Sequence, residues 1–200
     1  LINKYIKNGK NTLVLKIFRW STGSYLECQD FWRLSGIERD VFLYSQPKTA
    51  VKDFRVVSTL DDSYTNGIFK LAVDIRNNAA TDKNLQVLYE LIDKASGKVV
   101  ANATESCIVK GEDIQTVTFG ANLPGIKTWT SESPNLYKML ISLKEEDKVT
   151  EIVPFNVGFR RIEIKQIDQI AKNGKPYVVL MINGQPLKLK GVNIHEHNEH

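Results

Sequence analysis

Apolar and polar residues alternate with a period of two along most of this chain. Seven stretches show the pattern, each bounded by Asn, Asp, Gly or Pro: residues 53–60, 68–76, 84–92, 99–109, 114–119, 137–144 and 150–157. A period of two is typical of strands with one buried face. Seven such strands over about 110 residues predict an immunoglobulin-like β-sandwich.

The pattern extends on the N-terminal side of the predicted sandwich. Residues 13–18 alternate around Leu13, Leu15 and Ile17, and residues 36–44 form a second apolar run before Pro47. We predict a strand in each segment. Because proline interrupts strand pairing, we place a domain boundary near Pro47.

On the C-terminal side the pattern predicts a hairpin. Asn183-Gly184 lies between two alternating segments, residues 177–182 and 187–190. An Asn-Gly pair in this context is a strong signal for a tight hairpin turn. No segment has the caps and period of a helix, so we expect at most a single helical turn at residues 168–172.

Composition narrows the class of protein. With 42% hydrophobic and 25% charged residues over 200 positions, the chain has the profile of a soluble globular protein. The net charge of +4 is mild and the lysines are interspersed with acids, so we expect neither a nucleic-acid nor a membrane partner. Cys28 and Cys107 fall in different predicted units, and we expect two free thiols.

Residues 19–33, RWSTGSYLECQDFWR, combine four aromatic residues with acids and amides. Two interpretations fit this composition. The aromatic rings and the side chains of Glu27, Gln29 and Asp30 could form a site for a sugar or a cation. Alternatively, the aromatics plug a core and the acids face water.

Four stretches of the chain, in this order, resemble the signature motifs of glycoside hydrolase family 2, and most closely its β-galactosidases: RWSTGSYLECQDFWRLSGIERDV, WTSESPNLY, VGFRR and INGQPLKLKGVNIHEH. The resemblance implies an all-β chain in which residues 48–158 form the immunoglobulin-like β-sandwich. Residues 1–47 would be the C-terminal part of a sugar-binding jelly-roll domain, and residues 159–200 the truncated beginning of a catalytic (β/α)8 barrel. It also implies an internal fragment of a longer enzyme.

The resemblance assigns two substrate-binding residues. Asp30 would reach into the catalytic pocket and contact both a galactose hydroxyl and a sodium ion, and His195 would contact the galactosyl group. Carboxylate oxygen suits a hard cation. The chain departs from its nearest relatives at Thr22 and Cys28, where they have aspartate, and at Ile194, where arginine is common.

Two other motifs receive structural interpretations. Residues 129–137 are expected to anchor a corner of the sandwich through Trp129 and Tyr137, with sugar binding at Trp129 as the alternative. The segment from His195 to His200 lacks the histidine spacing of zinc proteases, and we do not expect a zinc site there.

Retaining glycoside hydrolysis requires two carboxylates about 5–5.5 Å apart, and no credible pair is present in the sequence. The family's acid/base and nucleophile glutamates would lie beyond residue 200. We therefore expect a fragment without activity or cofactor, from a homo-oligomeric parent that hydrolyses terminal β-galactosides and for which sodium and magnesium are the cofactors to consider. The alternatives are a non-catalytic carbohydrate-binding or adhesion module, or a fragment of a β-glucuronidase or β-mannosidase; the compartment, cytoplasm or periplasm, stays open.

Overall fold

The computed structural model describes residues 2–26, 36–37 and 39–193. The chain divides into two compact units, one ending at Ser45 and one beginning at Gln46.

The first unit contains no strand among its described residues. It has a 3-10 helix, η1 (Asn3–Tyr5), and one turn of α-helix, α1 (Gly23–Leu26), and none of its described residues is buried. The strands predicted at residues 13–18 and 36–44 are therefore wrong for the described residues. A strand exists only where a neighbouring backbone accepts and donates its hydrogen bonds, and alternation alone does not supply that neighbour.

The described residues of the second unit form ten strands. Their bounds are β1 (Thr49–Leu60), β2 (Gly67–Asn77), β3 (Lys83–Asp93), β4 (Val99–Val109), β5 (Ile114–Leu123), β6 (Tyr137–Glu145), β7 (Lys148–Val157), β8 (Ile162–Ile170), β9 (Pro176–Ile182) and β10 (Gln185–Pro186). The all-β class and the seven predicted sandwich strands are confirmed, with bounds that differ by a few residues.

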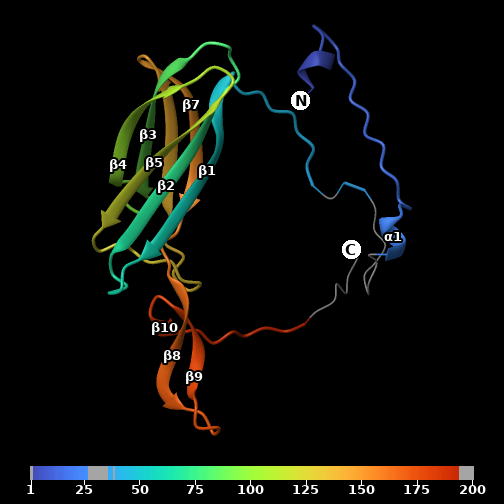
Figure 1. Ribbon diagram of the computed structural model, residues 1–200. Coiled ribbons are helices and arrows are strands. Elements are labelled where there is room, and N and C mark those ends of the chain that lie inside the picture. Colours follow the sequence, from blue (N-terminus) through green and yellow to red (C-terminus); the bar gives the residue numbers. More distant parts are fainter. Residues whose placement is uncertain (1, 27–35, 38, 194–200) are drawn as a thin grey trace. The chain divides into compact units, whose positions relative to one another are not determined.

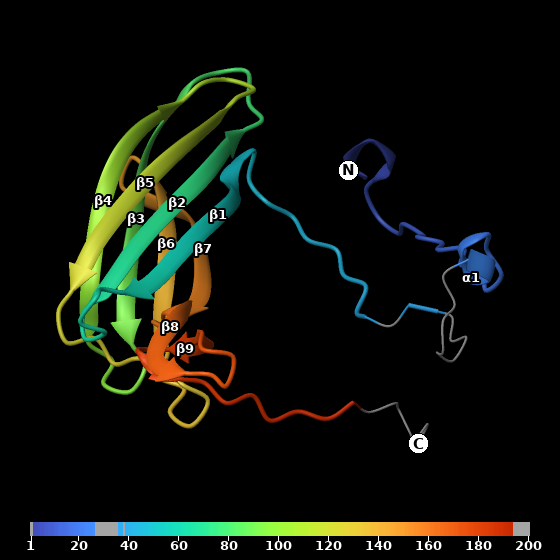
Figure 2. The same cartoon turned by 60° about the horizontal axis from the view of Figure 1, so that its bottom comes forward.

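Strands β1 to β7 form two antiparallel sheets that pack face to face (Figures 1 and 2). One sheet has the order β1-β2-β5 and the other β4-β3-β6-β7, so that β1 and β7 are both edge strands. This three-on-four arrangement is an immunoglobulin-like sandwich. Its core comes from alternate positions of the central strands, as the period of two requires. The buried side chains of these strands include Phe69, Leu71, Val73 and Ile75 on β2, Leu85, Val87, Tyr89 and Leu91 on β3, and Met139, Ile141 and Leu143 on β6.

One polar side chain is fully buried at an end of the sandwich. Asn77, at the end of β2, accepts hydrogen bonds through Oδ1 from Thr49 Oγ1 at 3.0 Å and from the backbone N–H of Ala79 at 2.9 Å. Its Nδ2 group points toward the carbonyl oxygens of Thr81, Val109 and Lys110 at 2.8, 3.3 and 3.2 Å. Because Thr49 belongs to one sheet and Val109 to the other, this amide ties the two layers together.

Strands β8, β9 and β10 form a third, small antiparallel sheet. The Asn-Gly turn predicted between its last two strands is confirmed, since Asn183 and Gly184 have φ angles of 48° and 78°, as a tight hairpin turn requires. Strand β8 was not predicted. Its pairing with β9 shifts register between Gln166 and Ile170, and this irregularity interrupts the period of two from which strands are recognised.

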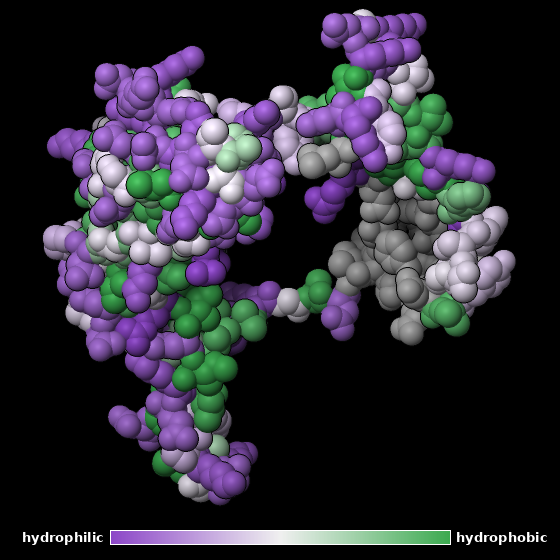
Figure 3. All heavy atoms as spheres, turned by 45° about the horizontal axis from the view of Figure 1, so that its top comes forward, coloured by the Kyte–Doolittle hydropathy of each residue, from purple (hydrophilic) through white to green (hydrophobic). Residues whose placement is uncertain are grey.

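One face of this small sheet is apolar. Ile162 and Ile164 of β8 lie opposite Ile182 and Leu180 of β9, so these four side chains share a face. Hydrophobic surface follows this part of the chain in the space-filling view (Figure 3). The opposite face carries Glu163 and Lys165, and it is the face that matters for the site below.

Candidate functional site

The two residues that the sequence assigns to substrate binding, Asp30 and His195, lie outside the described residues. The expected sodium ligand is Asp30 as well, so the sugar and metal assignments stay predictions. Within the described residues, no group of three or more His, Cys, Asp or Glu side chains could hold a metal ion. Over the same residues, the structure contains no helix of the length and apolar character needed to cross a membrane.

The described part of the aromatic stretch is a tight turn with exposed rings. The backbone N–H of Ser24 bonds the carbonyl of Ser21, and the Ser24 hydroxyl bonds the carbonyl of Arg19. The rings of Trp20 and Tyr25 are 55% and 76% exposed, so neither plugs a core within this unit. Residues 27–33 lie outside the described residues, so the site for a sugar or a cation stays a prediction.

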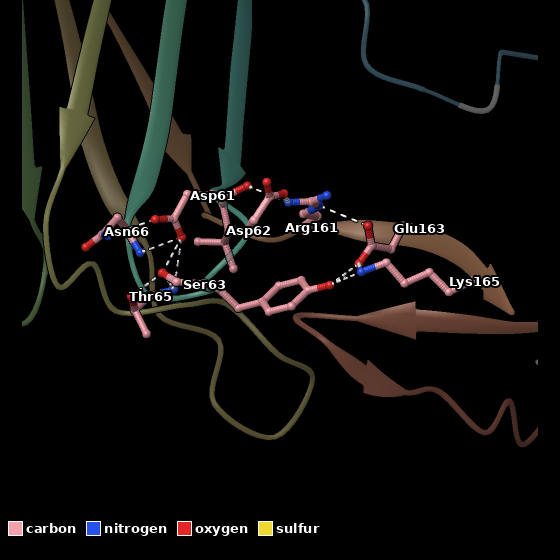
Figure 4. Close-up of polar contacts among 10 residues, drawn as sticks. Asp61, Asp62, Ser63, Thr65, Asn66, Arg161, Glu163 and Lys165 are labelled. Atoms are coloured by element: carbon pink, nitrogen blue, oxygen red, sulfur yellow. Dashed lines mark hydrogen bonds and ion pairs between the residues drawn. The ribbon is translucent and has the colours of Figure 1, made fainter. Parts of the chain in front are cut away.

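A cluster of polar side chains from distant parts of the sequence lies where the sandwich meets the β8–β10 sheet. The turn between β1 and β2, residues 61–66, supplies one side. Its conformation is held by Asp61, whose carboxylate accepts hydrogen bonds from the Ser63 hydroxyl at 2.7 Å and from Asn66 Nδ2 at 2.8 Å (Figure 4). These hydrogen bonds lower the pKa of Asp61 to about 2, so the turn keeps its anionic anchor at any physiological pH.

Tyr64, at the tip of this turn, has a φ angle of 59°, which is uncommon for a residue with a side chain. This backbone conformation directs its ring toward β8, where the hydroxyl donates to Glu163 and accepts from Lys165 (Figure 4). The Lys165 ammonium and the Arg161 guanidinium lie 5.2 and 5.4 Å from the centre of the ring. Two cations therefore share one aromatic residue with one carboxylate.

Tyr64, Arg161, Glu163 and Lys165 form one cluster of interacting side chains, which we call the Tyr64 cluster. Glu163 pairs with Arg161 Nε and with Lys165 Nζ, each at 3.0 Å. The hydrogen bonds from Tyr64 and Lys165 lower the pKa of Glu163, while the hydrogen bonds from Lys165 to Tyr64 and Glu163 raise the pKa of Lys165. Both groups are charged at neutral pH.

A second contact joins the same two parts of the chain through the Asn183-Gly184 turn. Asn183 Oδ1 accepts a hydrogen bond from the Arg161 backbone N–H at 2.9 Å, and its Nδ2 donates to the carbonyl of Trp129 at 3.1 Å. A side chain on Gly184 would place its Cβ 2.7 Å from the Tyr64 ring, so the glycine is required by close contact as well as by its φ of 78°.

Trp129 and Tyr137 form the corner that the sequence predicts. Tyr137 is buried, and its hydroxyl accepts a hydrogen bond from the backbone N–H of Lys127 at 3.0 Å. Trp129 is half-buried, donates its backbone N–H to the Phe159 carbonyl at 2.8 Å, and is covered by the Arg160 guanidinium 4.7 Å from its ring. One face of this tryptophan is therefore occupied by protein.

An open groove runs beside this corner along the edge strands β1 and β7. Its volume is about 620 Å³, and its lining includes Ser58, Phe155, Asn156, Arg160 and Ile162. The lining mixes apolar and polar groups and contains no Asp, Glu or His. It therefore offers surface for contact and no acid or base for chemistry.

Every described carboxyl group with a shifted pKa has it lowered: Asp61, Asp93, Glu132 and Glu163. A general acid for glycoside hydrolysis needs a raised pKa so that it carries a proton at neutral pH. The Tyr64 cluster was not predicted from the sequence. A signal was present, since Glu163 and Lys165 alternate along β8 and Arg161 precedes them with the same spacing.

Comparison with known proteins gives two family matches that together span residues 1–160. The model of the glycosyl hydrolases family 2 matches residues 49–160, and that of the glycosyl hydrolases family 2 sugar binding domain matches residues 1–47. The chain is 37% identical over 196 residues to a beta-galactosidase of Priestia megaterium and 37% identical over 197 residues to one of Streptococcus thermophilus. Each alignment covers 98% of this chain but only 18% and 17% of the relative.

Solved structures show the same fold at lower sequence identity. A Bacteroides uniformis beta-glucuronidase 2, covalently bound to cyclophellitol-6-carboxylate aziridine, aligns with a TM-score of 0.72 and 18% identity over 86% of this chain and 20% of that one. A second Bacteroides uniformis beta-glucuronidase aligns with a TM-score of 0.70 and 17% identity over 83% of this chain and 20% of that one. At these identities the likeness concerns the fold alone.

Proposed function

The chain belongs to glycosyl hydrolase family 2, and from this premise we propose that it serves as the non-catalytic part of a β-galactosidase that hydrolyses terminal β-galactosides with retention of configuration. The observation that carries the proposal is the identity of 34–37% to beta-galactosidases across 98% of the chain. The beta-glucuronidases align in structure at only 15–21% identity, which speaks for the shared fold and not for their substrate.

In this proposal the chain contributes recognition and support. Asp30 and His195 contact the galactosyl unit, and Asp30 provides the carboxylate oxygen that a sodium ion would prefer. The sandwich holds the β8–β10 sheet, from which residues 187–193 continue, through the Tyr64 cluster and the Asn183 contacts. The two carboxylates that carry out hydrolysis belong to the part of the longer protein that the chain does not include.

The test uses the longer protein, obtained by expressing the coding sequence around this chain. We expect turnover of an aryl β-galactoside and much slower turnover of the matching aryl β-glucuronide and β-mannoside. The 200-residue chain alone should show no turnover, because the proposal assigns both catalytic carboxylates to the rest of the longer protein. Preferential hydrolysis of the glucuronide or mannoside would overturn the proposal in favour of those members of the family.

Two substitutions in the longer protein test the assigned residues. Asp30→Asn keeps the shape but removes the charge, and His195→Phe removes a hydrogen-bonding group. Losing one polar contact to the transition state costs about 1–3 kcal/mol, or roughly one to two decades in rate. Asn78→Asp on the exposed surface of the sandwich serves as a control that leaves turnover unchanged. Full activity in either site variant would remove that residue from the site.

A binding measurement separates this proposal from the alternative of a carbohydrate-binding or adhesion module. Such a module would bind a galactoside by itself, whereas the proposal divides the site between this chain and the rest of the longer protein. We expect no saturable galactoside binding to the 200-residue chain in calorimetry. Saturable binding that is lost on replacement of Trp20 or Trp129 would favour the module.

A further inference from the structure

The β8–β10 sheet is attached to the sandwich at its base. Beyond Lys165, most residues of β8 are exposed, and on β9 only Met181 is buried. The sheet extends away from the sandwich (Figure 1). Its direction is therefore set by the few contacts at the base and not by burial along its length.

The first of these contacts would by itself allow the sheet to pivot. Asn183 bonds the backbone of Arg161 within the small sheet and reaches the sandwich only through the Trp129 carbonyl at 3.1 Å. Arg161 itself bonds Asp62 Oδ1 at 2.7 Å and the Leu60 carbonyl at 3.5 Å, and these bonds lie at the same end of the sheet. Contacts gathered at the chain crossing fix a point but constrain the angle only weakly. Rotation about that point has to be stopped by contacts made further out.

Tyr64 makes those contacts. It comes from the turn between β1 and β2 and approaches Gly184 closely. On β8 its hydroxyl meets Glu163 and Lys165 (Figure 4). At about 3.3 Å per residue, Lys165 lies roughly 13 Å along the strand from Arg161. Three contacts on two chain segments, at different distances from the pivot, resist both swinging and twisting.

We propose that Tyr64 is a positioning residue, whose ring and hydroxyl fix the direction in which the β8–β10 sheet leaves the sandwich. Residues 187–193 continue from this sheet, so the same side chain also sets where that segment starts. The consequence for turnover rests on the proposed function, whereas the statement about the sheet does not.

The geometry explains two features that otherwise have no purpose. Tyr64 carries a positive φ of 59° in a turn where glycine would be less strained, and Gly184 leaves room for a ring that comes from a turn far away in the sequence. Asp61 secures the strained turn through Ser63 and Asn66. The turn is thus built to hold one aromatic side chain in a fixed place.

The experiment measures distance between two spin labels in the full 200-residue chain by double electron–electron resonance. The labels are placed on exposed positions by Lys70→Cys on β2 and Lys172→Cys at the tip of the β8–β9 hairpin, with Cys28 and Cys107 replaced by serine. We expect a narrow distribution that becomes about twofold broader with Tyr64→Ala, as for a sheet released to pivot on a hinge. Tyr64→Phe keeps the contacts of the ring and should give an intermediate width.

Tyr177→Ala is the matched control, because Tyr177 lies on β9 with 47% of its surface exposed. It should leave the distribution unchanged. The melting temperature of the sandwich, followed in parallel, should fall with Tyr64→Ala, because this ring also packs against the sandwich core. It should change little with Tyr64→Phe, which keeps that packing, and with the control. If Tyr64→Ala does not fold, Glu163→Gln and Lys165→Met on the exposed strand replace it with the same expectation.

A distribution in the folded Tyr64→Ala variant, or in both strand variants, as narrow as in the wild type would overturn the proposal. In the longer protein, Tyr64→Ala should lower kcat while Tyr64→Phe restores part of it. If the longer protein hydrolyses no galactoside, the proposed function fails but the distance measurement still decides the role of Tyr64. If hydrolysis is normal and the distribution does not broaden, only the positioning role fails.

Discussion

Replacing Asn77 with aspartate tests how the two layers of the sandwich are joined. The substitution retains Oδ1, which accepts from Thr49 and Ala79, and replaces the donating Nδ2 group with oxygen. That oxygen then faces the carbonyl oxygens of Thr81, Val109 and Lys110 at 2.8–3.3 Å in a fully buried position. Three attractive contacts become three repulsive ones.

The magnitude follows from the cost of an unpaired buried charge. Leaving one without compensation destabilises a protein by about 3–5 kcal/mol. For a domain whose free energy of unfolding is about 5–15 kcal/mol, this is a large fraction of the total. Nearly all of the cost comes from ionisation, because a protonated carboxyl group can still donate to one carbonyl.

The pH dependence has a definite sign. Burial beside carbonyl oxygens raises the folded-state pKa of the introduced carboxyl group above its unfolded value. The penalty is therefore full at neutral pH and decreases as pH falls through that raised pKa. A charge cost of about 3 kcal/mol corresponds to a shift of roughly two pKa units, so the penalty should shrink between about pH 6 and pH 4.

Urea unfolding of the 200-residue chain, followed by circular dichroism at about pH 7.5 and about pH 5, measures the difference from wild type at each pH. Asn78→Asp is the matched control, because Asn78 is the next residue and is exposed, and its effect should stay within about 0.5 kcal/mol. If Asn77→Asp unfolds within about 0.5 kcal/mol of wild type, or with the same penalty at both pH values, the reasoning about this amide is refuted.

Three further substitutions test other parts of the sandwich. Phe159→Ala should lower the free energy of unfolding by about 3–5 kcal/mol, because its ring is fully buried, whereas Phe155→Ala, with 48% of that side chain exposed, should cost about 1 kcal/mol or less in the same urea titration. Gly111→Ala places a Cβ 2.2 Å from a backbone carbonyl oxygen and should cost at least about 1–3 kcal/mol, while Gly120→Ala, with no atom closer than 3.9 Å, should not destabilise; equal effects would contradict the packing argument. Hydrogen bonds, of which the one from a lysine side chain has the largest effect, lower the pKa of Asp93 to about 2. The contribution of this carboxylate to stability is therefore present above the ordinary pKa of 3.8 and is lost as pH falls toward about 2. Asp93→Asn should therefore flatten the fall of the melting temperature over that range, and an unchanged acid profile would exclude this role.

The alternation of residues determined most of the fold. On β2, Phe69, Leu71, Val73 and Ile75 are all buried, as a period of two predicts for a strand with one face in the core. The Asn183-Gly184 turn was likewise predictable, because few residue pairs adopt two successive positive φ angles. Both features depend on residues that are neighbours in the sequence, so they can be predicted from the sequence.

Alternation predicted the wrong structure in two places, because it does not show whether a strand has a regularly paired neighbour. Residues 13–18 have a strand pattern without a paired neighbour, and β8 has a paired neighbour with a register shift that breaks the pattern. Asp30 and His195 came from motif resemblance and lie outside the described residues, so they stay predictions that the experiments above address. A pattern reports which face of a strand is apolar, but whether a partner backbone is present depends on the rest of the chain.

The Tyr64 cluster and the Asn77 amide were decided by tertiary structure alone. In the sequence, Asn77 and Asn78 are adjacent and equivalent, yet only Asn77 meets carbonyl oxygens from the segment around Val109. Tyr64 and Gly184 are far apart in the sequence and lie in contact in the fold. Burial of apolar side chains needs only a suitable period, whereas the partners of a buried amide or a docked ring are individual groups that come from remote segments, and only the folded chain brings them within hydrogen-bonding distance.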